Sequence, residues 1–155
     1  AACTLSSYKF GISQFVAKMN LLAQKLNLKN TNFSNAIGLD YDLGIQESSA
    51  FDLYLMAKEA MKNGVFRKIV GTKEIVVHSS DSKFSHRIIS TNELLFEVPG
   101  TIGIKTGKTE KAKEVLVYDY SYKDDEIIIV VMGSNDRFLD AKTLLDYTLK
   151  NYEVL

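Results

Sequence analysis

The stretch "GIKTGKTEK" at residues 103–111 carries the clearest potential for chemistry in this sequence. It contains "GKT", which resembles the close of a P-loop, where G-x-x-x-x-G-K-[ST] lets successive backbone N–H groups surround a phosphate. The spacing does not fit, because the residue five positions before Gly107 is Ile102 rather than glycine. A P-loop also leads from a strand into a helix, whereas "EVLVYDY" at residues 114–120 alternates apolar and polar residues as a strand does. The sequence therefore disfavours a phosphate-binding loop.

Lys105, Thr106 and Gly107 instead favour a site for a carboxylate on a strand. A cation and a hydroxyl on neighbouring residues can recognise a carboxylate by charge and by hydrogen bonding. A glycine beside them lets another backbone approach the strand closely. We therefore treat these three residues as the candidate binding site that the remaining elements must position.

The composition narrows the classes of function. The 19 basic and 19 acidic residues give a formal net charge of +0, so we predict no nucleic-acid partner. A single cysteine, Cys3, and two histidines, His78 and His86, are too few for a structural zinc site, and we expect no metal and no cofactor. We interpret both histidines as strand residues rather than general bases. No apolar run is long enough to span a membrane.

Helical patterns dominate the first half of the chain. Apolar residues recur at helical spacing over residues 12–26 and predict a helix there. Ser49, followed three residues later by Asp52, resembles a capping box and predicts the start of a second helix. Its apolar stripe stops at residues 63–64, an Asn-Gly pair that indicates the helix end.

Short β-rich runs replace the helical patterns in the second half, and the last two are joined by the polar turn "SYKDD" as a hairpin. The runs are "EIVVH", "HRIIS", "TIGIK", "EVLVYDY" and "EIIIVVMG". A closing helix follows, with Asn135 or Asp136 as its N-cap. This order favours one α+β unit over residues 1–155, an antiparallel sheet flanked by helices. Its helical portion covers about residues 1–70 and its sheet portion about residues 71–155.

Several ordered segments resemble the D-alanyl-D-alanine carboxypeptidases, the low-molecular-mass penicillin-binding proteins of serine peptidase family S11. The likeness runs from about Phe15 to Tyr152. It is carried by "FVAKMNLLAQKLNLKNTNFSNAIGLD", "SSAFDLYLMAKEAMKNGVFRKIV", "TNELL", "GTIGIKTGKTEKA" and "RFLDAKTLLDY". The resemblance implies a β-lactamase/transpeptidase-like fold. It also implies an acyl-enzyme mechanism that removes the terminal D-alanine of peptidoglycan stem peptides, inhibition by penicillins, and export to the cell envelope, in the periplasm or on the outer face of the cytoplasmic membrane.

The family uses three motifs, S-x-x-K, S-x-N and K-T-G. By this likeness Lys105 supplies positive charge, Thr106 binds the substrate carboxylate with Gly107 beside it, and the backbone N–H of Lys108 forms part of the oxyanion hole. Arg137 matches an arginine of the family that helps to hold the carboxylate. An ion pair of Arg137 with Asp136 or Asp140 on the surface is the alternative that we leave open. The K-T-G strand of the family also pairs with the substrate backbone.

Two literal matches to the other motifs occur, at Ser6-x-x-Lys9 and at Ser90-x-Asn92. We interpret both as accidental, because Asn92 lies only 13 residues before Lys105, and in the family S-x-N is far upstream of K-T-G. Asn92 instead fits the family's N-x-L-L segment, and Ser6 is expected to be a surface hydroxyl on a helix.

We therefore expect the sequence to be the C-terminal part of a catalytic domain, without the nucleophile, its lysine and the S-x-N residues. An uncovered sheet edge and apolar face would then favour a homodimer or association with the N-terminal part. Another departure from the family is Lys113, which stands where glycine is usual.

Two alternatives remain. The first is a non-catalytic module of the same fold that binds peptidoglycan or a partner. The second is a segment of a class A β-lactamase, which shares K-T-G but is disfavoured by the "TNELL" and "GLD" segments.

Overall fold

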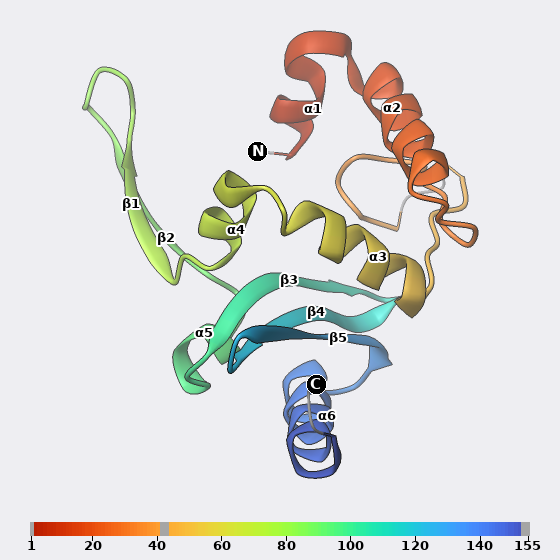
Figure 1. The fold of residues 1–155 in the computed structure, drawn as a ribbon. Coiled ribbons are helices and arrows are strands. Elements are labelled where there is room, and N and C mark those ends of the chain that lie inside the picture. The colour runs from red at the N-terminus through yellow and green to blue at the C-terminus, as the bar shows by residue number, and fades with distance from the viewer. Residues whose placement is uncertain (1, 41–43, 153–155) are drawn as a thin grey trace.

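The structure is a computed structural model that describes residues 2–40 and 44–152, with the backbone alone for Lys9 and Phe10. Its first half is helical, in agreement with the sequence. The helices are α1 (Ala2–Phe10), α2 (Ile12–Lys25), α3 (Ala50–Ala60) and α4 (Gly64–Val70). Figure 1 shows α1 beside α2, and α3 and α4 lying along the sheet.

Helix α3 begins where the capping pattern predicts. The side chain of Ser49 accepts a hydrogen bond from the backbone N–H of Asp52 at 3.1 Å. The carboxylate of Asp52 accepts from the N–H of Asn30 at 2.7 Å and from the hydroxyl of Thr31 at 2.8 Å. Asp52 is buried, so these bonds fasten the loop after α2 to the start of α3.

The Asn-Gly pair at residues 63–64 does more than end a helix. Helix α3 ends at Ala60, and the side-chain oxygen of Asn63 then accepts from the N–H groups of Val65 and Phe66 at 3.0 and 3.1 Å. Asn63 thereby caps a separate helix, α4, which the sequence pattern did not indicate.

All five predicted β-rich runs are strands, and every pairing between them is antiparallel. A two-stranded ribbon contains β1 (Glu74–His78) and β2 (Ser85–Ile89). A three-stranded sheet follows in the order β3 (Thr101–Thr109), β4 (Lys113–Tyr122) and β5 (Asp125–Ser134). The short helix α5 (Leu94–Glu97), which the sequence analysis did not predict, lies between the ribbon and the sheet in the chain.

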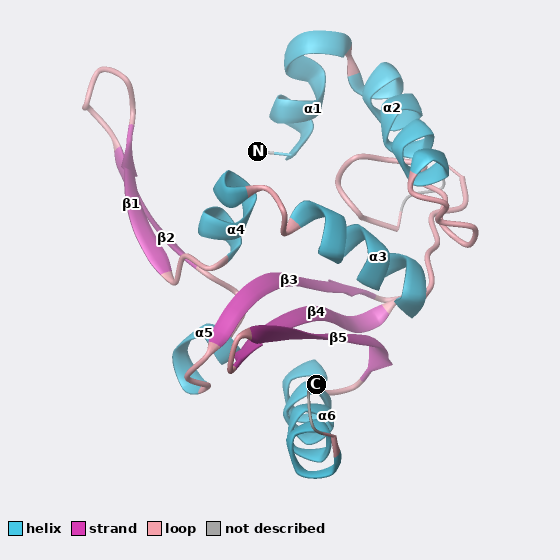
Figure 2. Ribbon diagram, in the orientation of Figure 1, coloured by secondary structure: helices cyan, strands magenta, loops and turns pink. Residues whose placement is uncertain are grey.

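The closing helix α6 (Arg137–Asn151) is capped by Asp136, one of the two predicted N-caps, whose carboxylate accepts from the N–H of Leu139 at 3.0 Å. Figure 2 shows the three-stranded sheet with α3 and α4 on one face and α6 on the other. Buried residues of β4 and β5 pack against Ala141 and Leu145 of α6 and against Leu94 of α5. A second cluster on the opposite face joins Ala57 and Met61 to Ile104. The α+β prediction is confirmed.

The β1–β2 ribbon extends away from the body of the molecule (Figure 1), and both of its strands are exposed along their whole length. Within residues 2–40 and 44–152, no helix combines the length and the apolar character that crossing a bilayer requires.

Candidate functional site

The candidate residues lie on β3, which is an edge strand of its sheet. β4 pairs with one side of β3, and no strand in the described part of the chain pairs with the other. Lys105 is opposite Val117 and Thr106 is opposite Leu116, and because side chains alternate along a strand, these two project from opposite faces. The unpaired edge of β3 therefore offers backbone hydrogen-bonding groups between a cation and a hydroxyl.

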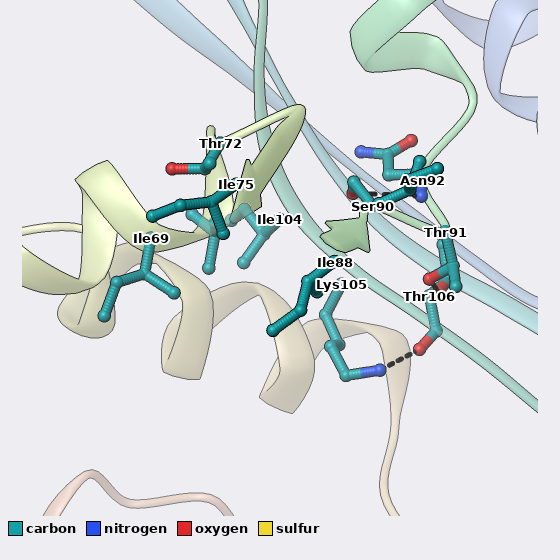
Figure 3. A pocket seen from close by; sticks show the side chains of 12 residues that line it. Ile69, Thr72, Ile75, Ile88, Ser90, Thr91, Asn92, Ile104, Lys105 and Thr106 are labelled. Atoms are coloured by element: carbon teal, nitrogen blue, oxygen red, sulfur yellow. Dashed lines mark hydrogen bonds between the residues drawn. The ribbon is translucent and has the colours of Figure 1, made fainter. Parts of the chain in front are cut away.

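Lys105 is exposed, and its ammonium group donates a hydrogen bond to the carbonyl oxygen of the next residue, Thr106 (Figure 3). The side chain thus folds back along its own strand. An anion that binds at this edge would meet the ammonium group directly, because Lys105 makes no ion pair among the described residues.

Thr106 is nearly buried, with 7% of its surface exposed. Its hydroxyl oxygen lies 2.6 Å from the hydroxyl oxygen of Thr91, a residue of the segment that precedes α5. The two hydroxyls share a hydrogen bond in which either oxygen can be the donor. The hydroxyl expected to bind a carboxylate therefore already has one partner.

Arg137 reaches the same strand from the start of α6. Its guanidinium group donates through Nη1 to the carbonyl oxygen of Gly107 at 2.9 Å. The Nε atom lies 4.0 Å from a carboxylate oxygen of Glu114 and has no hydrogen-bond partner among the described residues. The alternative ion pair is wrong, because the ion pair of Arg137 among the described residues is with Glu114, while Asp136 caps α6 and Asp140 accepts from Ser134 at 2.6 Å.

Glu114 links the two cations that flank the exposed Gly107. It pairs with the ammonium group of Lys108 at 2.9 Å and accepts from the backbone N–H of Arg137 at 3.3 Å. The hydrogen bond from Lys108, followed by that from Arg137, lowers the pKa of Glu114 below its ordinary value. Glu114 therefore stays ionised and tethers the start of α6 to the end of β3.

A hollow of about 450 Å³ opens beside Lys105 and Thr106. Its walls come from the end of α4, the β1–β2 ribbon, the segment before α5, and β3. Isoleucines supply the apolar part of the lining, and hydroxyl, amide and ammonium groups supply the polar part. The lining residues are Ile69, Val70, Thr72, Ile75, Ile88, Ile89, Ser90, Thr91, Asn92, Ile104, Lys105 and Thr106. A concave apolar surface with a few convergent polar groups is typical of a ligand site.

The literal S-x-N match at Ser90 and Asn92 forms a local turn. The hydroxyl of Ser90 accepts from the N–H of Asn92 at 3.2 Å, and the side-chain oxygen of Asn92 accepts from the N–H of Leu94 at 3.3 Å. Asn92 is buried, and its Nδ2 atom has no hydrogen-bond partner among the described residues.

The other literal match lies elsewhere, on α1. Ser6 is buried with 2% of its surface exposed, and its hydroxyl donates to the backbone carbonyl of Cys3 at 2.9 Å. The expectation of a surface hydroxyl is therefore wrong, because α1 turns this side chain inward against the chain. Helix α1 packs on α2, and the side chain of Lys9 lies outside what the structure describes.

His78 lies on β1 and His86 on β2, as predicted, one register position apart on the two paired strands. Among the described residues, no three His, Cys, Asp or Glu side chains gather as a metal site would require.

Sequence reasoning missed two residues at this site. Glu114 could have been found, because a hairpin that turns between Thr109 and Lys113 places residue 114 opposite Lys108. No sequence pattern pointed to Thr91. Its contact is with a residue 15 positions away, and local patterns do not show which distant segments the fold brings together.

The comparisons with known proteins agree on one family. A family model described as D-alanyl-D-alanine carboxypeptidase (Peptidase S11) matches residues 1–136. A D-alanyl-D-alanine carboxypeptidase of Bacillus subtilis, DacF, is 37% identical over 144 residues, which cover 90% of this chain and 36% of the relative. The D-alanyl-D-alanine carboxypeptidase DacB2 of Mycobacterium tuberculosis is 32% identical over 153 residues, which cover 95% of this chain and 52% of the relative.

Solved structures give the same result. A penicillin-binding protein homologue from Mycobacterium tuberculosis superimposes with a TM-score of 0.89 at 31% identity, over 99% of this chain and 60% of the other. The Streptomyces K15 DD-transpeptidase superimposes with a TM-score of 0.81 at 31% identity, over 89% of this chain and 55% of the other. The chain thus spans between 36% and 60% of the length of these four relatives.

Proposed function

Because this chain belongs to the D-alanyl-D-alanine carboxypeptidase family of S11 peptidases, we propose that it forms the substrate-binding wall of such an enzyme. The protein that contains the chain would remove the terminal D-alanine from peptidoglycan stem peptides through an acyl-enzyme. The observation that carries this proposal is the unpaired edge of β3, with Lys105, Thr106 and the guanidinium group of Arg137 along one strand.

In this proposal the substrate lies along β3 as an added strand, and its backbone pairs with the free edge. The terminal carboxylate accepts a hydrogen bond from the hydroxyl of Thr106, and the charges of Lys105 and Arg137 hold it in place. The acyl carbonyl then lies at the N–H of Lys108, which stabilises the negative charge that develops on its oxygen.

The nucleophilic serine, its lysine and the S-x-N residues would come from a part of the protein that this chain does not represent. Ser6 is a poor nucleophile where it lies, because it is buried and bonded to a carbonyl of its own helix. The family also leads us to propose export to the cell envelope and covalent inhibition of the complete enzyme by penicillins.

The experiment compares the 155-residue chain with the full-length protein, each mixed with excess penicillin, by intact mass. We expect a stoichiometric adduct on the full-length protein and none on the chain alone. An adduct on the chain would instead identify an activated serine within it.

Lys105→Ala in the full-length protein should lower the release of D-alanine from a D-Ala-D-Ala peptide by about two orders of magnitude, because a charge that stabilises bound substrate and transition state is lost. Lys150→Ala, at an exposed position near the end of α6, is the matched control and should leave the rate unchanged. A wild-type protein that binds the peptide and releases no D-alanine would instead support the non-catalytic binding module.

A further inference from the structure

We propose that Thr91 is a positioning residue that fixes the hydroxyl of Thr106 for recognition of the substrate carboxylate. This inference rests on the proposed function and adds a residue to it. The inference starts from the distance of 2.6 Å between the two hydroxyl oxygens. Among the described residues, this is the hydrogen bond that the Thr106 side chain makes.

The hydrogen-bonding capacity of the pair sets the direction of the bond. Each hydroxyl has one hydrogen to donate and two lone pairs that accept. A carboxylate can only accept, so Thr106 must give its single hydrogen to the substrate. Thr106 then has to accept from Thr91, and the hydrogen of Thr91 points at Thr106. A chain of two hydroxyls polarised in this direction makes the terminal donor stronger.

Thr91 is itself held from both sides. The N–H of Ser90 donates to the carbonyl of Lys73 at 2.8 Å, which ties the segment to the residue before β1. On the other side, the turn through Asn92 ends at the N–H of Leu94, whose side chain is fully buried. Threonine is also branched at Cβ, which limits its side-chain rotamers. The hydroxyl of Thr91 is therefore placed by anchored backbone rather than by a flexible loop.

The hollow beside β3 makes this arrangement relevant to a ligand. Thr91 and Thr106 both line it, and Lys105 lines it from the same strand as Thr106 (Figure 3). Thr91 is exposed whereas Thr106 is nearly buried. A carboxylate that enters the hollow therefore reaches the Thr106 hydroxyl beside the Thr91 hydroxyl that orients it.

The test uses Thr91→Val and Thr91→Ser in the full-length protein. Valine keeps the shape and removes the hydroxyl, whereas serine keeps the hydroxyl. We expect Thr91→Val to lower kcat/KM for a D-Ala-D-Ala peptide about tenfold, mainly through a higher KM. Thr91→Ser should restore it to within about twofold. Thr143→Val is the matched control, because that hydroxyl donates to the carbonyl of Leu139 within α6.

A second substrate separates positioning from general damage. A peptide whose terminal carboxylate is amidated cannot accept the charge-assisted bond from Thr106, so Thr91→Val should change its turnover by less than about twofold. Equal losses with both peptides would overturn the proposal, as would wild-type kinetics in Thr91→Val. Thr106→Val should remove most of the effect of a further change at Thr91, because the two act through one hydrogen bond.

Calorimetric binding of the D-Ala-D-Ala peptide distinguishes this proposal from the proposed function. If the wild-type protein binds the peptide and releases no D-alanine, the proposed catalysis fails, and weaker binding by Thr91→Val still supports the role of Thr91. Unchanged affinity in Thr91→Val overturns that role in either case. Absence of peptide binding by the wild-type protein overturns both proposals.

Discussion

The two faces of the β3–β4–β5 sheet differ in what is buried against them. The face that meets α6 holds an apolar cluster in which Leu94, Leu116 and Ala141 have no exposed surface. The face that meets α3 and α4 buries fewer apolar side chains, and it also buries a carboxylate, Asp119. The candidate site lies on β3, the edge strand of this sheet. The α6 face therefore carries the larger apolar core, built from β4, β5, α5 and α6, whereas β3 contributes Ile104 to the opposite face, which also holds charge and close backbone contact.

The α6 face should give the largest loss of stability when it is changed. Leu116→Ala removes a side chain with no exposed surface, and the cavity that remains should cost about 3 kcal/mol of unfolding free energy. Urea unfolding followed by circular dichroism measures this cost. Leu144→Ala is the control, because Leu144 is 46% exposed on α6, and it should cost less than about 1 kcal/mol. Equal costs would contradict the assignment of this face as the main core.

Asp119 should make the opposite face sensitive to pH. Burial, followed by repulsion from Glu126, raises the pKa of Asp119 to about 6, and neither carboxylate oxygen has a hydrogen-bond partner among the described residues. The folded protein therefore keeps the proton at a pH where the unfolded chain has lost it. Stability should fall as the pH rises from about 4 to about 6, by an amount on the order of 2 kcal/mol.

Asp119→Asn removes this titration. The difference in melting temperature between Asp119→Asn and the wild type should be more favourable to the variant at pH 7 than at pH 4. Thermal unfolding of both proteins at the two pH values measures this difference. Asp146→Asn, at an exposed position of α6, is the control. An identical shift of Asp119→Asn at both pH values would show that Asp119 does not titrate in this window.

Disturbing the close backbone packing between α4 and β3 should cost less stability. A Cβ atom added at Gly71 would lie 2.9 Å from the carbonyl oxygen of Ile102. Gly71→Ala should therefore cost roughly 1 to 2 kcal/mol, because the end of α4 must move away from the strand. Gly64→Ala is the control, since a Cβ at that position of α4 meets no atom within 4 Å. Thermal unfolding of the two variants gives the comparison, which fails if they lose the same stability.

The smallest expected effect concerns the turn between β3 and β4. Lys113 has a φ of 54°, in the left-handed region that favours glycine, the residue that the resemblance to the family led us to expect at this position. Lys113→Gly should stabilise the protein by up to about 1 kcal/mol, because the strain at Cβ is relieved. A rise in melting temperature would measure this gain, with Lys111→Gly in the same turn region as the control. A loss of stability in Lys113→Gly would show that the turn tolerates lysine without strain.

The strands and long helices followed from local patterns. Alternation and β-branched residues predicted all five strands, and Ser49 and Asp136 predicted helix starts, because each pattern acts within a few residues. The burial of Ser6 and the pairing of Thr91 with Thr106 could not be predicted in this way. Both depend on which segments the folded chain brings together.

Arg137 lies between these cases. Its resemblance to the family's arginine predicted a role in holding the substrate carboxylate, which stays a prediction, and the sequence offered Asp136 and Asp140 as equally simple partners. The register of β3 with β4 sets Glu114 beside Lys108, where Glu114 accepts from the backbone N–H of Arg137, and the guanidinium group of Arg137 donates to Gly107. The roles of Lys105, Thr106, Lys108 and Arg137 in binding remain proposals.

The consecutive order of β3, β4, β5 and α6 has a consequence for how the protein folds. These elements occupy one uninterrupted stretch, residues 101–151, and each packs on its neighbour in the chain. Contacts between segments close in sequence have a small loop-closure cost and form early. The strand that bears the proposed site should therefore belong to a cooperative unit whose amides exchange slowly with solvent, centred on β4. The proposed substrate wall can thus be assembled before the more distant helices dock on it.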